Sequence, residues 1–242
     1  MNDTELPLLE HIAELRQRLL RSILAIILGA GVGLVITPPV LRWLVRPLKG
    51  GEVIVLSPTE APVIYFKVAL LLGFVLALPY ILYQLYAFVE PGLKPNEKRP
   101  FIIGIPAAIA LFLLGALFTL QVLIPLSMPV LMGFLANIVK PNYSLEEYVS
   151  FVTILIFWMG LLFQTPLVIY FLARMGWITP ERLSRLRKII IFVAAFVAAA
   201  ITPTTDPVTM LLVTGPFLIL YEAGILLAKL AVRQRARATV EP

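Results

Sequence analysis

The uncharged stretch FIIGIPAAIALFLLGALFTLQVLIPLSMPVLMGFLANIV, residues 101–139, decides the fold class. A helix crosses a bilayer core with about 20 apolar residues, whereas this stretch would form a helix of roughly 58 Å at 1.5 Å per residue. It therefore predicts one full crossing over 101–123, followed by a partly buried outer segment. Pro125 and Pro129 lie where we expect the helix to break.

Five further stretches without charge extend this interpretation over most of the chain. They are Ser22–Leu41, Val68–Val89, Tyr148–Ala173, Ile189–Thr205 and Pro207–Tyr221. Of the 242 residues, 60% are hydrophobic and 14% are charged, whereas a soluble domain averages about 25% charged residues. The composition predicts an all-α integral membrane protein that forms a single membrane domain over 1–242. No connection is long enough to fold as a soluble catalytic domain.

Six transmembrane spans are predicted, and an amphipathic helix over 4–21 precedes the first. The apolar side chains of that helix recur at spacings of three and four, which lines one face. The spans lie at about 22–41, 62–89, 101–123, 147–173, 188–201 and 208–227. We expect Pro38 and Pro39 to end the first helix. A helix over 188–201 would measure about 21 Å, so we expect two short last spans, a locally thin bilayer and a concave rather than closed bundle.

The basic residues indicate the orientation of the chain. Fifteen of the 20 Lys and Arg residues fall in the terminal segments and in the loops 90–100 and 174–188. Because Lys and Arg are enriched in cytoplasmic loops, this distribution predicts that both termini are cytoplasmic. Acidic residues precede the first apolar run, which is not typical of a cleaved signal peptide. The first span is therefore expected to stay as an anchor.

Several classes of chemistry are excluded by residue usage. The sequence has no cysteine and a single histidine, His11, so disulfides, thiolate sites and a histidine-built metal site are excluded. His11 is expected to be a helix-surface side chain. The spans hold no HExxH motif, paired aspartates or Ser/Lys dyad, so we expect no enzyme, no cofactor, no metal and no nucleic-acid partner.

Few polar residues lie inside the predicted spans, and such residues are the usual functional candidates in membrane proteins. For Gln84 and Gln121 the favoured interpretation is a hydrogen bond between helices. Gln164 in the fourth span has two interpretations, an internal hydrogen bond or a contact with a polar group on a partner helix. Glu222 lies in the cytoplasmic half of the last span.

Two acidic residues, Glu14 and Glu97, lie in otherwise basic cytoplasmic segments. One interpretation is local pairing, of Glu14 with Arg18 at i,i+4 and of Glu97 with its basic neighbours. The other is that two carboxylates at one membrane surface receive a cationic ligand, with arginine favoured because its guanidinium binds a carboxylate with two hydrogen bonds. The residues alone favour local pairing.

Several motifs occur in order along nearly the whole chain. They are HIAELRQRL (11–19), PYILYQLYAF (79–88), PGL (91–93), EKR (97–99), YVSF (148–151), MGWI (175–178) and TP (202–203) followed by Asp206. Together they resemble the TatC family, the polytopic subunit of the twin-arginine protein translocase. The resemblance implies a receptor in the cytoplasmic (inner) membrane of a prokaryote. Such a receptor recognises the twin-arginine motif of folded export substrates and works with TatA- and TatB-type single-span proteins. Transport is then driven by the proton motive force.

The resemblance also implies functional positions. The motif-binding carboxylates of the family map onto Glu14 and Glu97, and further family positions map onto Arg16, Pro47, Asp206 and Glu222. The chain departs from the family at Gln164, where a glutamate is common, and at Thr204–Thr205, where the family usually has one proline. A role that requires ionisation at position 164 is therefore not expected. Self-association in the lipid bilayer is expected.

One alternative function is a small-molecule secondary transporter, which would have a substrate site near the midplane between broken helices. Prolines within the spans fit broken helices, but no intramembrane charged pair accompanies them.

Overall fold

The computed structural model describes residues 5–46, 53–93, 95–133, 143–202 and 206–238, and this part of the chain is helical apart from two short strands. The elements are α1 (Glu5–Leu44), β1 (Val53–Ile54), α2 (Glu60–Val89), the 3₁₀ turn η1 (Glu90–Gly92), α3 (Pro95–Phe118), the π turn η2 (Thr119–Leu123), α4 (Ile124–Gly133), β2 (Tyr143–Ser144), α5 (Leu145–Leu162), α6 (Thr165–Met175), α7 (Pro180–Arg185), α8 (Arg187–Ile201) and α9 (Pro207–Ala238).

The chain forms two compact units. The N-terminal unit comprises Met1–Val40 and Tyr65–Ile109, and the C-terminal unit comprises Leu41–Ile64 and Ala110–Pro242. Five helical segments of the described ranges are long and apolar enough to cross a membrane: Glu10–Leu44, Glu60–Gly92, Pro100–Leu131, Leu145–Met175 and Pro207–Arg235. The expectations of a single membrane domain, of six spans and of their limits stay predictions.

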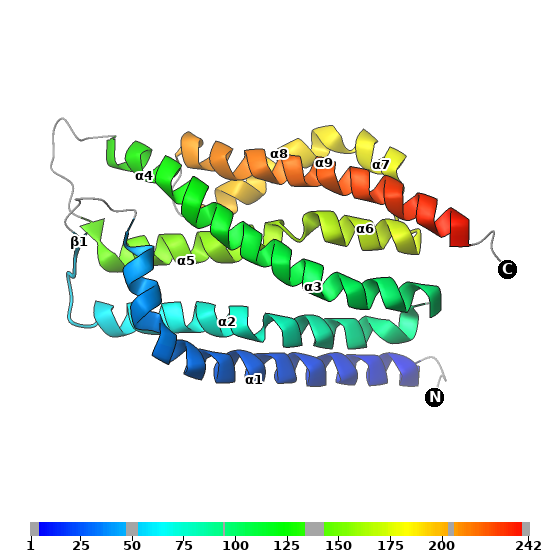
Figure 1. The fold of residues 1–242 in the computed structure, drawn as a ribbon, viewed down its shortest axis with the longest axis horizontal. Helices are drawn as coiled ribbons and strands as arrows, with labels where there is room; N and C mark the ends of the chain where they lie inside the picture. The colour runs from blue at the N-terminus through cyan, green and yellow to red at the C-terminus, as the bar shows by residue number, and fades with distance from the viewer. Residues whose placement is uncertain (1–4, 47–52, 94, 134–142, 203–205, 239–242) are drawn as a thin grey trace. The chain divides into compact units, whose positions relative to one another are not determined.

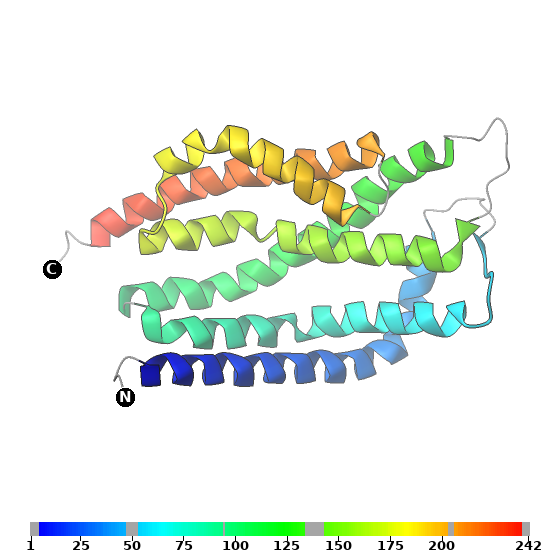
Figure 2. The same cartoon turned by 180° about the vertical axis from the view of Figure 1, so that it is seen from behind.

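In the N-terminal unit, α1 and α2 lie side by side along most of their length (Figures 1 and 2). Glycines bring the two backbones together. A Cβ atom at Gly29 would lie 2.6 Å from the Gly73 carbonyl oxygen, and one at Gly33 would lie 2.6 Å from the Ala69 carbonyl oxygen. A Cβ atom at Gly73 would collide with the backbone of Ala30. Helices in lipid associate through such close van der Waals packing, because lipid tails are as apolar as the side chains.

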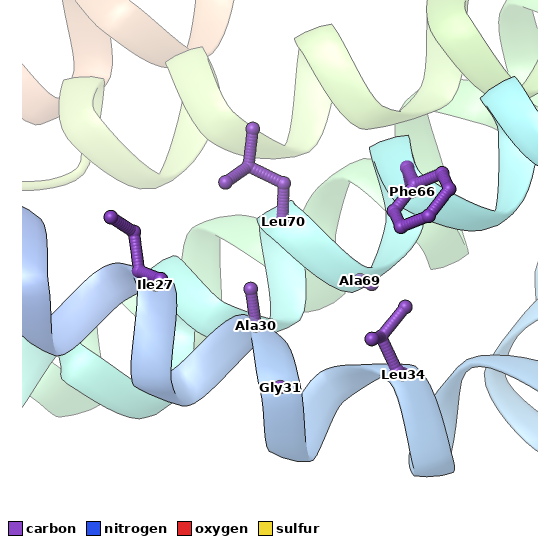
Figure 3. A pocket seen from close by; sticks show the side chains of 7 residues that line it. All are labelled: Ile27, Ala30, Gly31, Leu34, Phe66, Ala69 and Leu70. Carbon is purple, nitrogen blue, oxygen red and sulfur yellow. The ribbon is translucent and has the colours of Figure 1, made fainter.

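An open apolar groove lies between these two helices (Figure 3). It is lined by Ile27, Ala30, Gly31 and Leu34 of α1 and by Phe66, Ala69 and Leu70 of α2. None of these side chains carries a polar group that would orient a small polar substrate. The groove therefore gives the secondary-transporter interpretation no support.

Helix α1 continues past Pro38 and Pro39 to Leu44, so the expectation that these prolines end the helix is wrong. Pro38 has no N–H with which to reach the carbonyl oxygen of Leu34, four residues earlier. The hydroxyl of Tyr65 on α2 donates to that oxygen at 2.6 Å. The carbonyl group therefore keeps a hydrogen bond, and this contact removes part of the energy that a helix-interior proline costs.

The expected break at Pro125 and Pro129 is also wrong, because helical structure continues from Pro95 to Gly133. Directly before Pro125 the chain forms the π turn η2, in which the Ile124 N–H donates to the Thr119 carbonyl oxygen. A π turn holds one residue more than an α-helical turn. Leu123 and Ile124 are fully buried at this turn.

In the C-terminal unit the predicted fourth span, 147–173, is divided into α5 and α6. Pro166 lies in the first turn of α6, where a missing N–H costs little. Helix α6 packs against α9 (Figure 1), in a core of Ile169, Ala173, Leu183, Tyr221, Ile225, Ala228 and Ala231. Helix α8 lies against α9 on the side seen in Figure 2.

The last two helices differ in length. Helix α8 has 15 residues, which is about 22 Å, so one short helix is present as expected. Helix α9 has 32 residues and runs past Glu222 to Ala238, so the expectation of a short last helix is wrong. Glutamate is a good helix former, and the exposed Glu222 carboxylate is paired with Arg187.

A two-residue parallel strand pair joins two segments that lie outside the predicted spans. Val53 pairs with Tyr143, and Ile54 pairs with Ser144. Ser144 is also the N-cap of α5, where its hydroxyl accepts from the Glu147 N–H at 3.4 Å. The strand pair therefore lies directly before the start of α5.

Candidate functional site

The first part of the candidate site is the carboxylate of Glu14, near the N-terminal end of α1. Its Oε1 atom accepts two hydrogen bonds from Arg18, one helical turn later, at 2.9 Å from Nε and 2.6 Å from Nη2. The two side chains are partly exposed, 33% for Glu14 and 21% for Arg18. Local pairing of Glu14, which the i,i+4 spacing predicts, is therefore confirmed.

Helix α2 supplies the next contacts. Gln84 is only 4% exposed, and its Oε1 atom accepts a hydrogen bond from Arg18 Nη1 at 3.3 Å. This confirms the predicted hydrogen bond between helices for Gln84. His11 is on the helix surface, as predicted; its ring stacks on Phe88 at 4.3 Å between centroids, and its Nδ1 atom lies 3.7 Å from Glu14 Oε2. The Glu14 carboxylate thus lies within a polar cluster that two helices build.

Glu97 lies in the first turn of α3, and its side chain is outside the described part of the structure. Its neighbour Lys98 donates to Glu90 at 3.0 Å. The N-terminal end of α1 and the turn from α2 to α3 lie at the same end of the N-terminal unit (Figures 1 and 2). The fold therefore brings the backbone positions of Glu14 and Glu97 to one end of this unit. Arg16 is exposed on the same part of α1.

Gln164 lies at the junction of α5 and α6 in the C-terminal unit, where it is the N-cap residue of α6. Its side chain is partly buried and donates from Nε2 to the Gly160 carbonyl oxygen at 3.4 Å. A hydrogen bond to the preceding helical turn is the internal interpretation of this glutamine.

Two acidic candidates lie on or beside α9. One carboxylate oxygen of Asp206 accepts from the Thr209 N–H at 2.6 Å, which caps the helix. Glu222 bonds Arg187 of α8 through both oxygens, at 2.7 Å to Nε and 2.7 Å to Nη2. These residues are sixteen positions apart, about 24 Å along a helix, so the structure does not bring the two carboxylates together. Pro47 and Thr204–Thr205 lie outside the described residues.

Sequence reasoning missed the partners that come from distant segments. Phe88 of α2 stacks on His11, a neighbour of Glu14 on α1, and Arg187 of α8 binds Glu222 of α9. The only signal in the sequence was residue type, because a half-exposed glutamate beside a basic loop favours an arginine partner. Which arginine it would be depends on how α8 and α9 pack.

Comparison with known proteins gives consistent matches. Residues 10–216 match the family described as Sec-independent protein translocase protein (TatC). The chain is 41% identical over 236 residues to a Sec-independent protein translocase protein TatC of Aquifex aeolicus, covering 95% of this chain and 98% of the relative. It is 35% identical to TatCy of Bacillus subtilis, covering 99% of this chain and 95% of the relative.

Solved structures match as well. A crystal structure described as the twin arginine translocase receptor TatC superposes with a TM-score of 0.82 at 41% identity, covering 91% of this chain and 99% of that chain. A second crystal structure of that receptor, in DDM, has a TM-score of 0.82 at 40% identity and covers 90% of this chain and 99% of that chain.

Proposed function

The chain belongs to the TatC family of Sec-independent protein translocase proteins, and from this premise we propose that it binds the twin-arginine signal peptides of folded proteins. It is a multi-pass membrane protein and a component of a protein-transport system, not of a catalytic enzyme family. As the receptor and core subunit of the twin-arginine translocase, it exports these proteins with small single-span partners of the TatA and TatB types, using the proton motive force.

The observation that carries the proposal is the Glu14 carboxylate, which already binds a guanidinium group. Arg18 bonds one oxygen of Glu14, so this position has the chemistry that an arginine ligand requires. Glu97, in the first turn of α3, lies at the same end of the N-terminal unit. Two carboxylates match two guanidinium groups, and hydrogen bonds that involve a charged group contribute about 1.5–3 kcal/mol each.

The distribution of basic residues and the lengths of the helices indicate the orientation of the chain and the local thickness of the bilayer. The uneven distribution of Lys and Arg favours an orientation with both termini in the cytoplasm, in the inner membrane of a prokaryote. In this orientation the peptide arrives from the side where folded cargo is made. The short helix α8, about 22 Å long against a core of about 30 Å, favours a locally thin bilayer and a concave, partly hydrated face.

Partner assembly is assigned to the polar position within the fourth span. Gln164 is a polar side chain at the junction of α5 and α6, and a hydrogen bond between it and a polar side chain of a single-span partner would contribute on the order of 1 kcal/mol in a membrane. Self-association of the chain within the bilayer completes the proposed assembly.

Crosslinking tests the proposal. A signal peptide that carries a photo-crosslinker next to its two arginines is added to the full chain in lipid nanodiscs. We expect crosslinks to the segments around Glu14 and Glu97, and their loss when both peptide arginines are replaced by lysine, because an ammonium group cannot form the paired bonds of a guanidinium. Crosslinks that do not depend on the arginines, or that fall elsewhere, would refute the proposed binding site.

A further inference from the structure

The ligand position at Glu14 is occupied by a group of the chain itself. Arg18 places Nε and Nη2 on a single carboxylate oxygen, Oε1, at 2.9 Å and 2.6 Å. The other oxygen, Oε2, faces His11 at 3.7 Å, which is too long for a hydrogen bond. An incoming guanidinium group binds a carboxylate best through both oxygens. To do so here, it has to take the place of Arg18 on Oε1.

Arg18 is held in this position from a second helix. Gln84, almost fully buried on α2, accepts from Nη1, and α2 is held against α1 through backbone contacts at Gly29 and Gly73. The arginine is the less exposed member of the pair, at 21% against 33% for Glu14. Partial burial weakens screening by water and salt, so this pair is harder to open than an exposed pair.

We infer that Arg18 is an internal competitor for the Glu14 carboxylate, so that a guanidinium group binds both oxygens of Glu14 only by displacing it. The inference rests on the proposed function and adds a residue that sets affinity. A lysine ligand binds as a single point charge and can use Oε2 without opening the Glu14–Arg18 pair. Arg18 therefore lowers the affinity for an arginine ligand more than the affinity for a lysine ligand. A weaker complex also releases its peptide faster, because related complexes differ mainly in dissociation rate.

The test is the affinity of a fluorescent twin-arginine signal peptide for the purified full chain, measured by fluorescence anisotropy. We expect Arg18→Met to raise the affinity about three- to ten-fold, which is the range for removing a partly buried competing pair. Arg18→Lys should give a smaller rise, because lysine binds the carboxylate through a single point charge. A twin-lysine peptide should gain less, because an ammonium group can bind Oε2 without displacing Arg18. Arg21→Met removes the same charge from an exposed position on α1 and should leave the affinity unchanged.

Four outcomes would overturn the inference. Weaker binding by Arg18→Met would mean that Arg18 positions the carboxylate for the peptide. An equal rise in Arg21→Met would mean a general effect of charge. An undiminished effect of Arg18→Met in a Glu14→Gln background would place the effect elsewhere. A gain for the twin-arginine peptide that is no larger than the gain for the twin-lysine peptide would mean that Arg18 acts through its charge and not by occupying Oε1. If thermal melting shows that Arg18→Met does not fold, Arg18→Lys carries the test, and an affinity at or below that of the unchanged chain refutes the inference.

Failure of the proposed function can be distinguished from failure of the competitor role of Arg18. If Glu14→Gln and Glu97→Gln both leave peptide binding unchanged, the receptor site is wrong and the inference falls with it. If both weaken binding while the Arg18 variants do not strengthen it, only the competitor role is wrong.

Discussion

Two glutamate–arginine pairs, one in each unit, use the same side chains in different geometries. Glu14 and Arg18 belong to one helix, and both hydrogen bonds end on one carboxylate oxygen. Glu222 and Arg187 belong to different helices, and each carboxylate oxygen has its own nitrogen. The second pair uses the whole carboxylate to join α8 to α9. The first leaves one oxygen of Glu14 without a hydrogen bond from Arg18, so a carboxylate in this geometry suits exchange of ligands.

The largest effect that would separate the two pairs is on peptide binding. Glu14→Gln and Glu97→Gln should each weaken binding of a twin-arginine peptide by about tenfold or more, because a charge-assisted bond of about 1.5–3 kcal/mol is lost. Glu222→Gln is the matched control in the other pair and should bind normally. Isothermal titration of the three variants measures this, and an equal loss in Glu222→Gln would remove the distinction between the pairs.

The packing of α1 against α2, which holds the first pair in position, can be disrupted without changing the charges of Glu14 and Arg18. Gly73→Val should reduce stability by about 1–3 kcal/mol, because a side chain at this position meets the backbone of Ala30 and pushes α1 away from α2. Gly31→Val adds the same group where no atom lies within 4 Å and should change stability little. Thermal unfolding in detergent compares them. Equal melting temperatures for both variants would show that the helices tolerate wider separation.

The sequence predicts contacts that follow from local spacing better than it predicts contacts between distant helices. The i,i+4 spacing of Glu14 and Arg18, the amphipathic stripe of α1 and a hydrogen bond between helices at Gln84 follow from local periodicity and from the cost of a polar group in an apolar layer. The partner of Glu222 does not follow, because it depends on tertiary packing of two helices.

Prolines show a second limit of local reasoning. Pro166 accompanies a helix break, whereas Pro38 and Pro125 lie within continuing helices. At Pro38 the tertiary structure contributes, because Tyr65 donates to the Leu34 carbonyl oxygen that proline leaves without its helical partner. A short strand pair between two loops was likewise invisible to periodicity.

The third effect concerns a neutral polar side chain, Gln164, rather than a charged pair. Gln164→Leu should weaken assembly with a small single-span partner by about fivefold, the factor for on the order of 1 kcal/mol, and leave signal-peptide binding intact. Gln164→Glu should be tolerated, since the family commonly has glutamate there. Co-purification of the partner with each variant measures assembly. Full assembly and export in the leucine variant would mean that Gln164 only stabilises its own helix turn.

The smallest expected effect is the coupling free energy between the two side chains of each pair. A double-mutant cycle on Arg187 and Glu222 should give a coupling of about 0.3–1 kcal/mol, because both side chains are about half exposed and screened by water. The same cycle on Glu14 and Arg18, without peptide, should give a larger value because Arg18 is less exposed. The order of the two couplings, measured from melting curves at two salt concentrations, tests this ranking.

The π turn η2 has a consequence for how this chain tolerates changes in length. Each residue of an α-helix advances the helix by about 100°, but the wider π turn holds one extra residue within a single turn, so the helix after it keeps its phase. Ile124, Ser127 and Met128 are buried after the turn, while Gln121 and Val122 within it are exposed. Deleting a single residue at Val122 would convert the π turn into an α-helical turn and leave that buried face in place. In this segment a one-residue deletion is therefore expected to be tolerated better than in a uniform part of the helix.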